Sequence, residues 1–179
     1  NVSPDAHLAP SVGDSSSKTS SKAWHKIDGV CYNGSGKKVE GAITRGMDVS
    51  EWQGKINWKE AKKDLDFAFV RISYGTRHLD DYYDYNMTEA EAADVPVGTY
   101  VYSLAKTNKE ALAEAQLAIR QMQGHKVSYP VAFDLEDEAT LGTLTRKEIS
   151  QIALTFCDEI RKAGYTPILY MNLNWYNNF

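Results

Sequence analysis

The stretch "SYPVAFDLED", residues 128–137, joins an apolar run to a group of acids. From Val131 to Leu135 the run is apolar apart from Asp134, which is typical of a strand buried inside a parallel sheet. Two more acids, Glu136 and Asp137, follow at once. Because an unpaired carboxylate is costly to bury, these acids either mark the exit of the strand into solvent or serve chemistry.

Four further stretches have the character of strands, and helical patterns separate them. The strand candidates span residues 44–50, 67–74, 96–103, 127–135 and 166–172. This alternation predicts parallel βαβ units with right-handed crossovers, an α/β fold with helices outside the sheet. A doubly wound sheet and a barrel both fit the pattern. No GxGxxG or GxxxxGKS/T motif follows any of these strands, which argues against the usual nucleotide-binding sites.

Short local signals mark where the helices begin and end. A polar cap residue stands three positions before a glutamate in three pairs: Asn57 with Glu60, Thr107 with Glu110, and Thr145 with Glu148. Gly124 and Gly164 stand where C-terminal glycines of helices belong. Within 145–163 the apolar residues fall on one helical face, namely Ile149, Ile152, Phe156 and Ile160.

The overall composition is that of an ordinary globular protein. With 179 residues, 42% hydrophobic and 25% charged, the chain can form one well-buried domain with a short appendage. A formal charge of −4 argues against a nucleic-acid partner, which usually requires a basic face. No apolar run approaches the roughly 18 residues that span a bilayer, so we expect no membrane span.

The N-terminal part of the chain differs from the rest. Residues 1–22 are rich in serine and poor in large apolar side chains, so we expect a disordered segment or linker. Residues 23–43 alternate large side chains with turn formers, including Asp28-Gly29 and "NGSG" at 33–36, and predict a short β-hairpin. Residues 44–179 then form the main domain.

Neither the cysteines nor the histidines form a metal-binding motif. Cys31 and Cys157 are far apart; we expect Cys157 to be a small buried residue of a helix, and a disulfide between the two is left open. The histidines show no metal-ligand spacing: His7, His25, His78 and His125. We therefore expect no metal and no cofactor.

The acids of two strands indicate a common site. Asp134 and Glu136 point the same way, because side chains alternate along a strand. Asp48 stands at the end of the first strand candidate, and catalytic groups collect at the carboxyl ends of parallel strands. Each acid alone could be solvated or cap a helix. Together, after so apolar a strand, they favour a functional site.

Two reactions use acids arranged in this way: glycoside hydrolysis and metal-assisted phosphoester hydrolysis. A glycosidase needs one carboxyl group that stays protonated near neutral pH, which crowding by other carboxylates favours, and one that is ionised. Sugars also stack on aromatic rings, and the candidates near the strand ends are Tyr74, Tyr100, Tyr102, Tyr170 and Trp175. Each of these residues could equally belong to the core.

Several motifs resemble the glycoside hydrolase family 25 lysozymes, which are N-acetylmuramidases of bacteria and phages. The motifs are "RGMDVSEWQGKINW", "FAFVRISYGT", "DYYDYNMTEAEAADVPVGTYVYS", "YPVAFDLED" and "ILYMNLNWY", within about residues 44–179. The most specific part is D-V-S-x-x-Q-G followed in order by D-L-E. This resemblance implies an irregular, TIM-like (β/α) barrel, of which the chain supplies about five β/α units.

The resemblance also implies a reaction and its residues. The family cleaves the β-1,4 bond between N-acetylmuramic acid and N-acetylglucosamine in peptidoglycan, without a metal. By motif, Glu136 is the expected general acid, with Asp48 and Asp134 as partner carboxylates; inversion and participation of the substrate N-acetyl group both remain open. The expected substrate-binding residues are Tyr100, Tyr102, Tyr170 and Trp175.

Residues 23–43 are similar to a single aromatic repeat of the cell-wall-binding type, and we expect a packing hairpin there. The family domain continues beyond residue 179, so we expect missing C-terminal strands and an open sheet edge through which the chain could self-associate. The implied location is extracellular, secreted or at the cell wall. The alternatives are a non-catalytic glycan-binding fragment and, with less support, a metal-dependent phosphodiesterase on a similar barrel.

Overall fold

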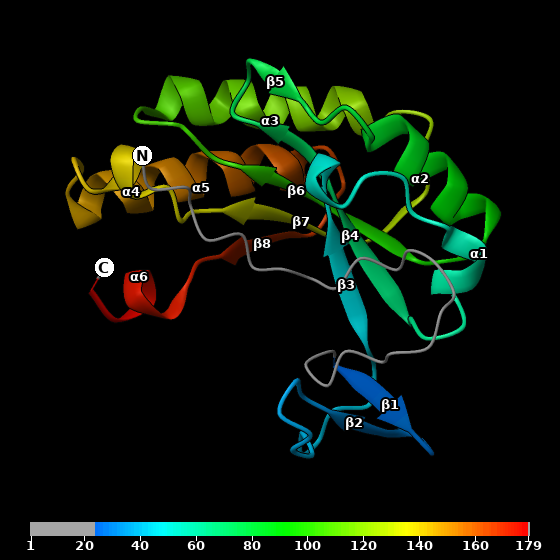
Figure 1. Ribbon diagram of the computed structural model, residues 1–179. Helices are drawn as coiled ribbons and strands as arrows, with labels where there is room; N and C mark the ends of the chain where they lie inside the picture. Colours follow the sequence, from blue (N-terminus) through cyan, green and yellow to red (C-terminus); the bar gives the residue numbers. More distant parts are fainter. Residues whose placement is uncertain (1–23, 179) are drawn as a thin grey trace.

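The computed structural model describes residues 24–178, in which strands and helices alternate (Figure 1). The linker predicted for residues 1–22 lies outside this part of the chain. Within it, no helix has the length and apolar character that crossing a bilayer requires. The elements are β1 (His25–Ile27), β2 (Val30–Tyr32), β3 (Gly46–Val49), η1 (Glu51–Gln53), α1 (Trp58–Ala61), β4 (Phe67–Tyr74), β5 (His78–Leu79), α2 (Tyr83–Ala92), β6 (Val97–Tyr102), α3 (Asn108–Met122), β7 (Val127–Asp134), α4 (Glu138–Leu141), α5 (Arg146–Lys162), β8 (Pro167–Tyr170) and α6 (Leu173–Asn178).

A mainly parallel sheet forms the centre of the molecule. Its strands lie in the order β3-β4-β6-β7-β8, all parallel neighbours, and the short β5 pairs antiparallel with β4. Every parallel strand lies within its predicted range. The order never reverses, as it does in a doubly wound sheet, so the strands are added in one direction as in a barrel. The predicted α/β fold is confirmed, and among the described residues β3 and β8 are the end strands of an unclosed sheet.

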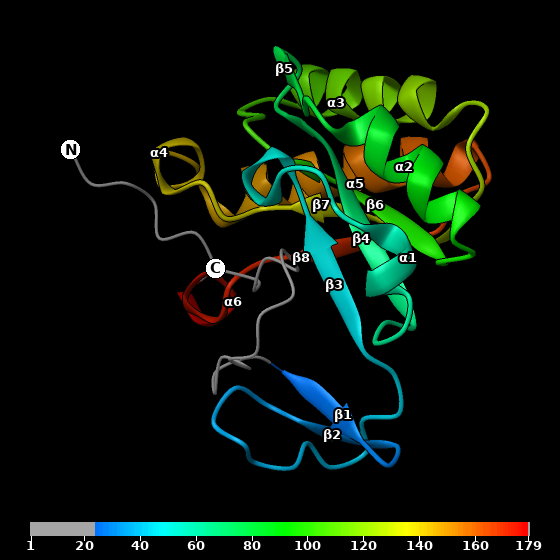
Figure 2. The same cartoon turned by 45° about the vertical axis from the view of Figure 1, so that its right-hand side comes forward.

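Helices α2, α3 and α5 cover one face of this sheet (Figures 1 and 2). The strand side chains that point toward them are apolar and fully buried, among them Val70, Val101 and Phe133. The ring of Phe133 stacks on that of Phe156 in α5, with the centroids 4.0 Å apart. The fully buried apolar positions of the strands therefore form the core under these helices, and the opposite face of the sheet also carries polar side chains.

The helix ends follow the local signals in the sequence. The side chains of Asn57, Thr107 and Thr145 each accept a hydrogen bond from the backbone N–H three residues on, at 3.3, 3.2 and 3.3 Å. After α3 and α5, Gly124 and Gly164 have φ of 89° and 91°, where glycine is favoured. These predicted caps are confirmed.

The hairpin β1–β2 lies at the amino end of β3 (Figure 2). Its turn residues Asp28 and Gly29 have φ of 48° and 80°, as a tight two-residue hairpin turn requires. The Nζ atom of Lys26 reaches the main domain at Oδ2 of Asp66, 3.4 Å away, and also lies 3.2 Å from the carbonyl oxygen of Ile43 in the segment before β3. The hairpin therefore stands at the opposite end of β3 from Asp48.

Both cysteines are buried and free. Cys31 lies in β2, beside a pocket of about 200 Å³ between the hairpin and the start of β3. Cys157 lies on the buried side of α5, as predicted for a small apolar residue of that helix. No disulfide joins the hairpin to the main domain, which answers the question that the sequence left open.

Candidate active site

Strand register places the predicted site residues on the uncovered face of the sheet. In β6, Tyr100 lies opposite Arg71 of β4, and Tyr102 lies opposite Asp134 of β7. Opposite residues of a parallel pair, and residues two apart on one strand, point to the same face. By this rule the face that α2, α3 and α5 leave uncovered carries Asp48, Arg71, Tyr100, Tyr102, Asp134 and Tyr170.

The chain between Asp134 and Glu136 is fixed on both sides by neighbouring segments. The carbonyl oxygen of Asp134 accepts a hydrogen bond from the backbone N–H of Ser103, at 2.9 Å. The N–H of Leu135 donates to the carbonyl oxygen of Tyr170, also at 2.9 Å, and its side chain is buried. Glu136 therefore begins from a fixed point at the end of β7, where its half-buried side chain lies near the site.

The third acid of the group has a structural role. Oδ2 of Asp137 accepts a hydrogen bond from the backbone N–H of Thr140 at 2.8 Å and caps α4. The capping alternative considered for these acids thus applies to Asp137, and the candidates for chemistry are Asp48, Asp134 and Glu136.

Asp134 is the most buried of these three carboxyl groups. It is 6% exposed, and its Oδ1 has no hydrogen-bond partner among the described residues. Burial, followed by the negative charges of Glu136 and Asp48, raises the pKa of Asp134 to about 8. The sequence predicted that crowding would keep a carboxyl group protonated. In the structure the effect falls on Asp134, because Asp134 is the one withdrawn from solvent.

The charges of these acids affect the pKa values of three of the predicted tyrosines. Burial and then the charge of Asp48 raise the pKa of Tyr100, and burial and then Asp137 raise that of Tyr102. Burial and then the charge of Glu136 raise the pKa of Tyr170, which is 45% exposed. The ring of Tyr102 stacks on that of Tyr74 with centroids 4.8 Å apart. Tyr170 thus offers an accessible ring, whereas Tyr102 forms part of a stacked pair.

Trp175 does not lie as expected for a sugar platform. It lies in α6, is only 6% exposed and packs in the hydrophobic core. Since a sugar must approach the open face of an aromatic ring, this burial corrects its assignment to substrate binding.

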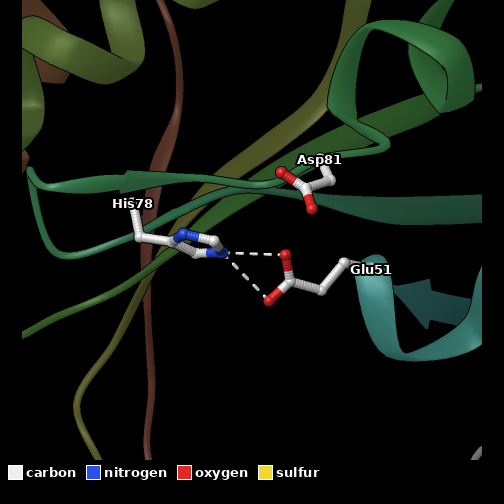
Figure 3. Close-up of side chains that lie close together, drawn as sticks. All are labelled: Glu51, His78 and Asp81. Carbon is white, nitrogen blue, oxygen red and sulfur yellow. Dashed lines mark hydrogen bonds and ion pairs between the residues drawn. The ribbon is translucent and has the colours of Figure 1, made fainter.

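The structure adds a buried arginine that the motifs did not single out. Arg71 is 5% exposed; its Nε lies 2.9 Å from Oδ2 of Asp80 and its Nη2 lies 2.8 Å from Oε1 of Glu51. Nε2 of His78 lies 2.8 Å from the other oxygen of Glu51 (Figure 3). Glu51 is distant in sequence from Arg71, His78 and Asp80, so no short spacing motif reveals the group. The available signal was an arginine inside the apolar run "FAFVRISY".

Potential metal-ligand atoms of Glu51, His78 and Asp81 lie within 4.8 Å of one another (Figure 3). The Glu51 carboxylate already interacts with the Arg71 guanidinium, the His78 ring and the backbone N–H of Asp81. Burial raises the pKa of Glu51, but the hydrogen bond from His78 and the charge of Arg71 outweigh it, and the net pKa is lowered. We therefore interpret this group as a hydrogen-bonded network.

A second buried acid holds the loop that follows β6. Glu114 of α3 is 2% exposed and accepts hydrogen bonds from Ser103 Oγ at 2.8 Å and from the Leu104 N–H at 3.0 Å. Burial raises its pKa to about 7. Since Ser103 also bonds to Asp134, Glu114 supports the chain beside the site.

Two substitutions test this supporting role. Glu114→Ala removes both acceptors inside the core and is expected to lower the free energy of unfolding by about 3 kcal/mol. Glu114→Gln keeps an acceptor for Leu104 and has no charge to bury, so its stability should match that of the parent at pH 4, below the ordinary pKa of 4.5, and exceed it at pH 9. Chemical denaturation at the two pH values measures both effects. Equal losses for the two variants at pH 9 would contradict the assignment.

Comparison with known proteins identifies the family to which the chain belongs. The sequence profile described as "Glycosyl hydrolases family 25" matches residues 47–179. The chain is 26% identical over 139 residues to Uncharacterized protein YegX of Escherichia coli strain K12, covering 74% of this chain and 49% of YegX. It is 38% identical over 60 residues to Lysozyme M1 of Streptomyces globisporus, covering 33% of this chain and 20% of that protein. The chain thus spans about half the length of YegX.

Solved structures share the fold. The autolysin LytC of Streptococcus pneumoniae superposes with a TM-score of 0.73 at 24% identity, over 86% of this chain and 39% of LytC. LytC in complex with a synthetic peptidoglycan ligand superposes with a TM-score of 0.68 at 25% identity, over 83% of this chain and 37% of LytC. The arrangement of strands and helices described above therefore recurs in this autolysin.

Proposed function

Because this chain belongs to glycosyl hydrolase family 25, we propose that it hydrolyses the β-1,4 bond between N-acetylmuramic acid and N-acetylglucosamine in peptidoglycan. One observation carries the proposal: Asp134, buried and protonated near neutral pH, lies on the same open face as Asp48 and directly before Glu136. A glycosidase needs such a mixture of a protonated and an ionised carboxyl group.

We assign proton donation to Glu136. Its half-buried side chain stands beyond the end of β7, where a glycosidic oxygen can reach it, whereas Asp134 lies deeper. The general acid gives its proton to the leaving oxygen as the bond breaks.

Asp48 and Asp134 are the proposed partner carboxyl groups. Asp48 is exposed on the uncovered face and is suited to stabilise the positive charge that develops on the sugar or to orient a water molecule. Asp134, while protonated, can donate a hydrogen bond to a substrate oxygen. Direct attack by water gives an inverted anomer, and participation of the N-acetyl group gives a retained one, so the first-formed anomer distinguishes the two routes.

Product analysis on purified peptidoglycan tests the function. The chain is incubated with the polymer, new ends are reduced with borohydride, and the reduced sugars are identified with and without EDTA. We expect muramitol from new N-acetylmuramic acid ends and no effect of EDTA. Glucosaminitol would indicate cleavage of the other glycosidic bond, and loss of activity in EDTA would indicate metal-dependent chemistry. Pelleting with the polymer without new ends would indicate a glycan-binding fragment.

We place this activity outside the cell, at the cell wall. Support comes from LytC, an autolysin whose structure was solved with a synthetic peptidoglycan ligand. The intact polymer is found only there, so a chain that acts on it has to be secreted or wall-associated.

We propose that residues 23–43 are a hairpin that packs on the main domain rather than a wall-binding array. The contact of Lys26 with Asp66 supports this role, as does the burial of Cys31. A wall-binding array would instead present several aromatic repeats in series.

We also propose that the chain self-associates through β8. Among the described residues this strand pairs only with β7, and Ile168, Leu169 and Tyr170 are 38%, 46% and 45% exposed. An exposed apolar edge strand readily pairs with another chain, and a lysine in it opposes pairing. We expect light scattering to show dimers at high concentration for the parent and monomers for Leu169→Lys. A parent that stays monomeric throughout the series would contradict this.

A further inference from the structure

Arg71 lies on the uncovered face of the sheet, the face that carries Asp48 and Asp134, although no motif assigns it a role. Its register partner on β6 is Tyr100, and it shares its face with Asp48 and Asp134. Only 5% of Arg71 is exposed, so its charge is directed into the protein. A buried guanidinium is unfavourable unless anions surround it, which indicates that its surroundings are arranged for it.

Two acids outside the catalytic group fix the guanidinium. Asp80 accepts from Nε of Arg71 at 2.9 Å, and it also accepts from the backbone N–H groups of Glu51 and Tyr82 at 2.8 and 3.0 Å. Glu51 lies 2.8 Å from Nη2 of Arg71 and is itself held by His78 (Figure 3). These contacts lock the η1 turn, three residues after Asp48, to the loop after β5.

The positive charge of Arg71 affects the pKa values of side chains on the uncovered face. It opposes the effects of burial and of like charge on Asp134, and it also lowers the pKa of Tyr100 against the effect of burial. Without this cation, the charges of Glu136 and Asp48 would raise the pKa of the buried Asp134 still further. Arg71 is the buried cation on this face among the described residues.

We propose that Arg71 is a positioning residue of the site: held by Asp80 and Glu51, its guanidinium supplies the positive charge that lets Asp48, Asp134 and Glu136 stand together. It acts through these carboxyl groups and does not itself touch the substrate. The activity test of this proposal rests on the proposed function, and a second test does not.

The first test compares three arginine variants in peptidoglycan hydrolysis. Arg71→Met keeps the length of the side chain without its charge and is expected to lower kcat about 10-fold or more with little change in KM. Arg71→Lys keeps the charge and should retain much of the activity that Arg71→Met loses. Arg77→Met also removes one positive charge, but from an exposed position between β4 and β5. It should match the parent. Full activity of a folded Arg71→Met, or a Lys variant no better than Met, would overturn the proposal.

The second test follows the Asp134 carboxyl carbon by NMR as the pH is raised. In Arg71→Met its titration should move at least one pH unit upward from the parent, and in Arg77→Met it should not move. This readout needs no hydrolysis, so an inactive parent would defeat the proposed function while leaving this test intact. Unchanged titration in Arg71→Met would overturn the positioning role.

A fourth variant, Glu51→Gln, covers the case in which Arg71→Met does not fold. Glu51→Gln keeps the shape of the side chain and leaves Arg71 in place, but it removes the ion pair between Glu51 and the guanidinium. It should lower kcat several-fold at unchanged KM and shift the Asp134 titration in a folded protein. Parent-like kcat and titration in Glu51→Gln would overturn the role of the network.

Discussion

Glu136→Gln is expected to lower the rate of peptidoglycan hydrolysis by about 1,000-fold while leaving the fold intact. Glutamine has the size and shape of glutamate but holds no proton that it can give to the leaving oxygen. Glu136 is half-buried and lies two residues beyond the end of β7, so the change removes neither a helix cap nor a fully buried side chain. The release of reducing ends measures the loss.

Glu138→Gln is the matched control for this prediction. It makes the same chemical change two residues further along, at an exposed position in the first turn of α4. It should retain the activity of the parent. If both variants lost activity equally, the loss would reflect a general change of charge beside the site. A fully active Glu136→Gln would remove Glu136 from the role of general acid.

Asp134→Asn is expected to lower activity about 100-fold and, at the same time, to stabilise the protein above pH 7. The pKa of Asp134 is raised from 3.8 to about 8 in the folded protein, so between these values the native state binds more protons than the unfolded chain. Stability then falls as the pH rises through this window, because the buried group must ionise or the protein must unfold. Asparagine occupies the same space without a charge and escapes this penalty.

Thermal unfolding at pH 5 and pH 8 tests the effect on stability. The Tm of the parent should fall between the two values more steeply than that of Asp134→Asn, and at pH 8 the variant should melt about 5 °C higher. Glu114, whose raised pKa acts with the same sign, is present in both proteins, so the difference isolates Asp134. Parallel pH dependences in parent and variant would mean that Asp134 is ionised throughout the range.

The sequence predicted the elements well, because their signals are local. The apolar run that becomes β4, the caps at Thr107 and Thr145, and the glycine after α5 each depend on residues within a few positions. Local signals could not choose between a doubly wound sheet and a barrel. That choice depends on strand order, which is set by packing between segments far apart in the chain.

The position of the candidate site was predicted in part, and the differences have a common physical cause. Asp48, Asp134 and Glu136 were proposed from acids at strand ends and from the family motifs, and the register places Asp48 and Asp134 on one face. Depth of burial is a tertiary property, so the sequence could not tell that Asp134 is the acid most withdrawn from solvent or that Trp175 belongs to the core.

The peptide between Asp134 and Leu135 is bonded to the neighbouring segments on both sides, through Ser103 and Tyr170. The two acids on either side of Leu135 are therefore tied to the central sheet. Such a site has no separate transition of its own, in contrast to one carried on a mobile lid. On heating, catalysis should decline only where the far-ultraviolet signal also changes, and cooling that restores the sheet should restore turnover with it.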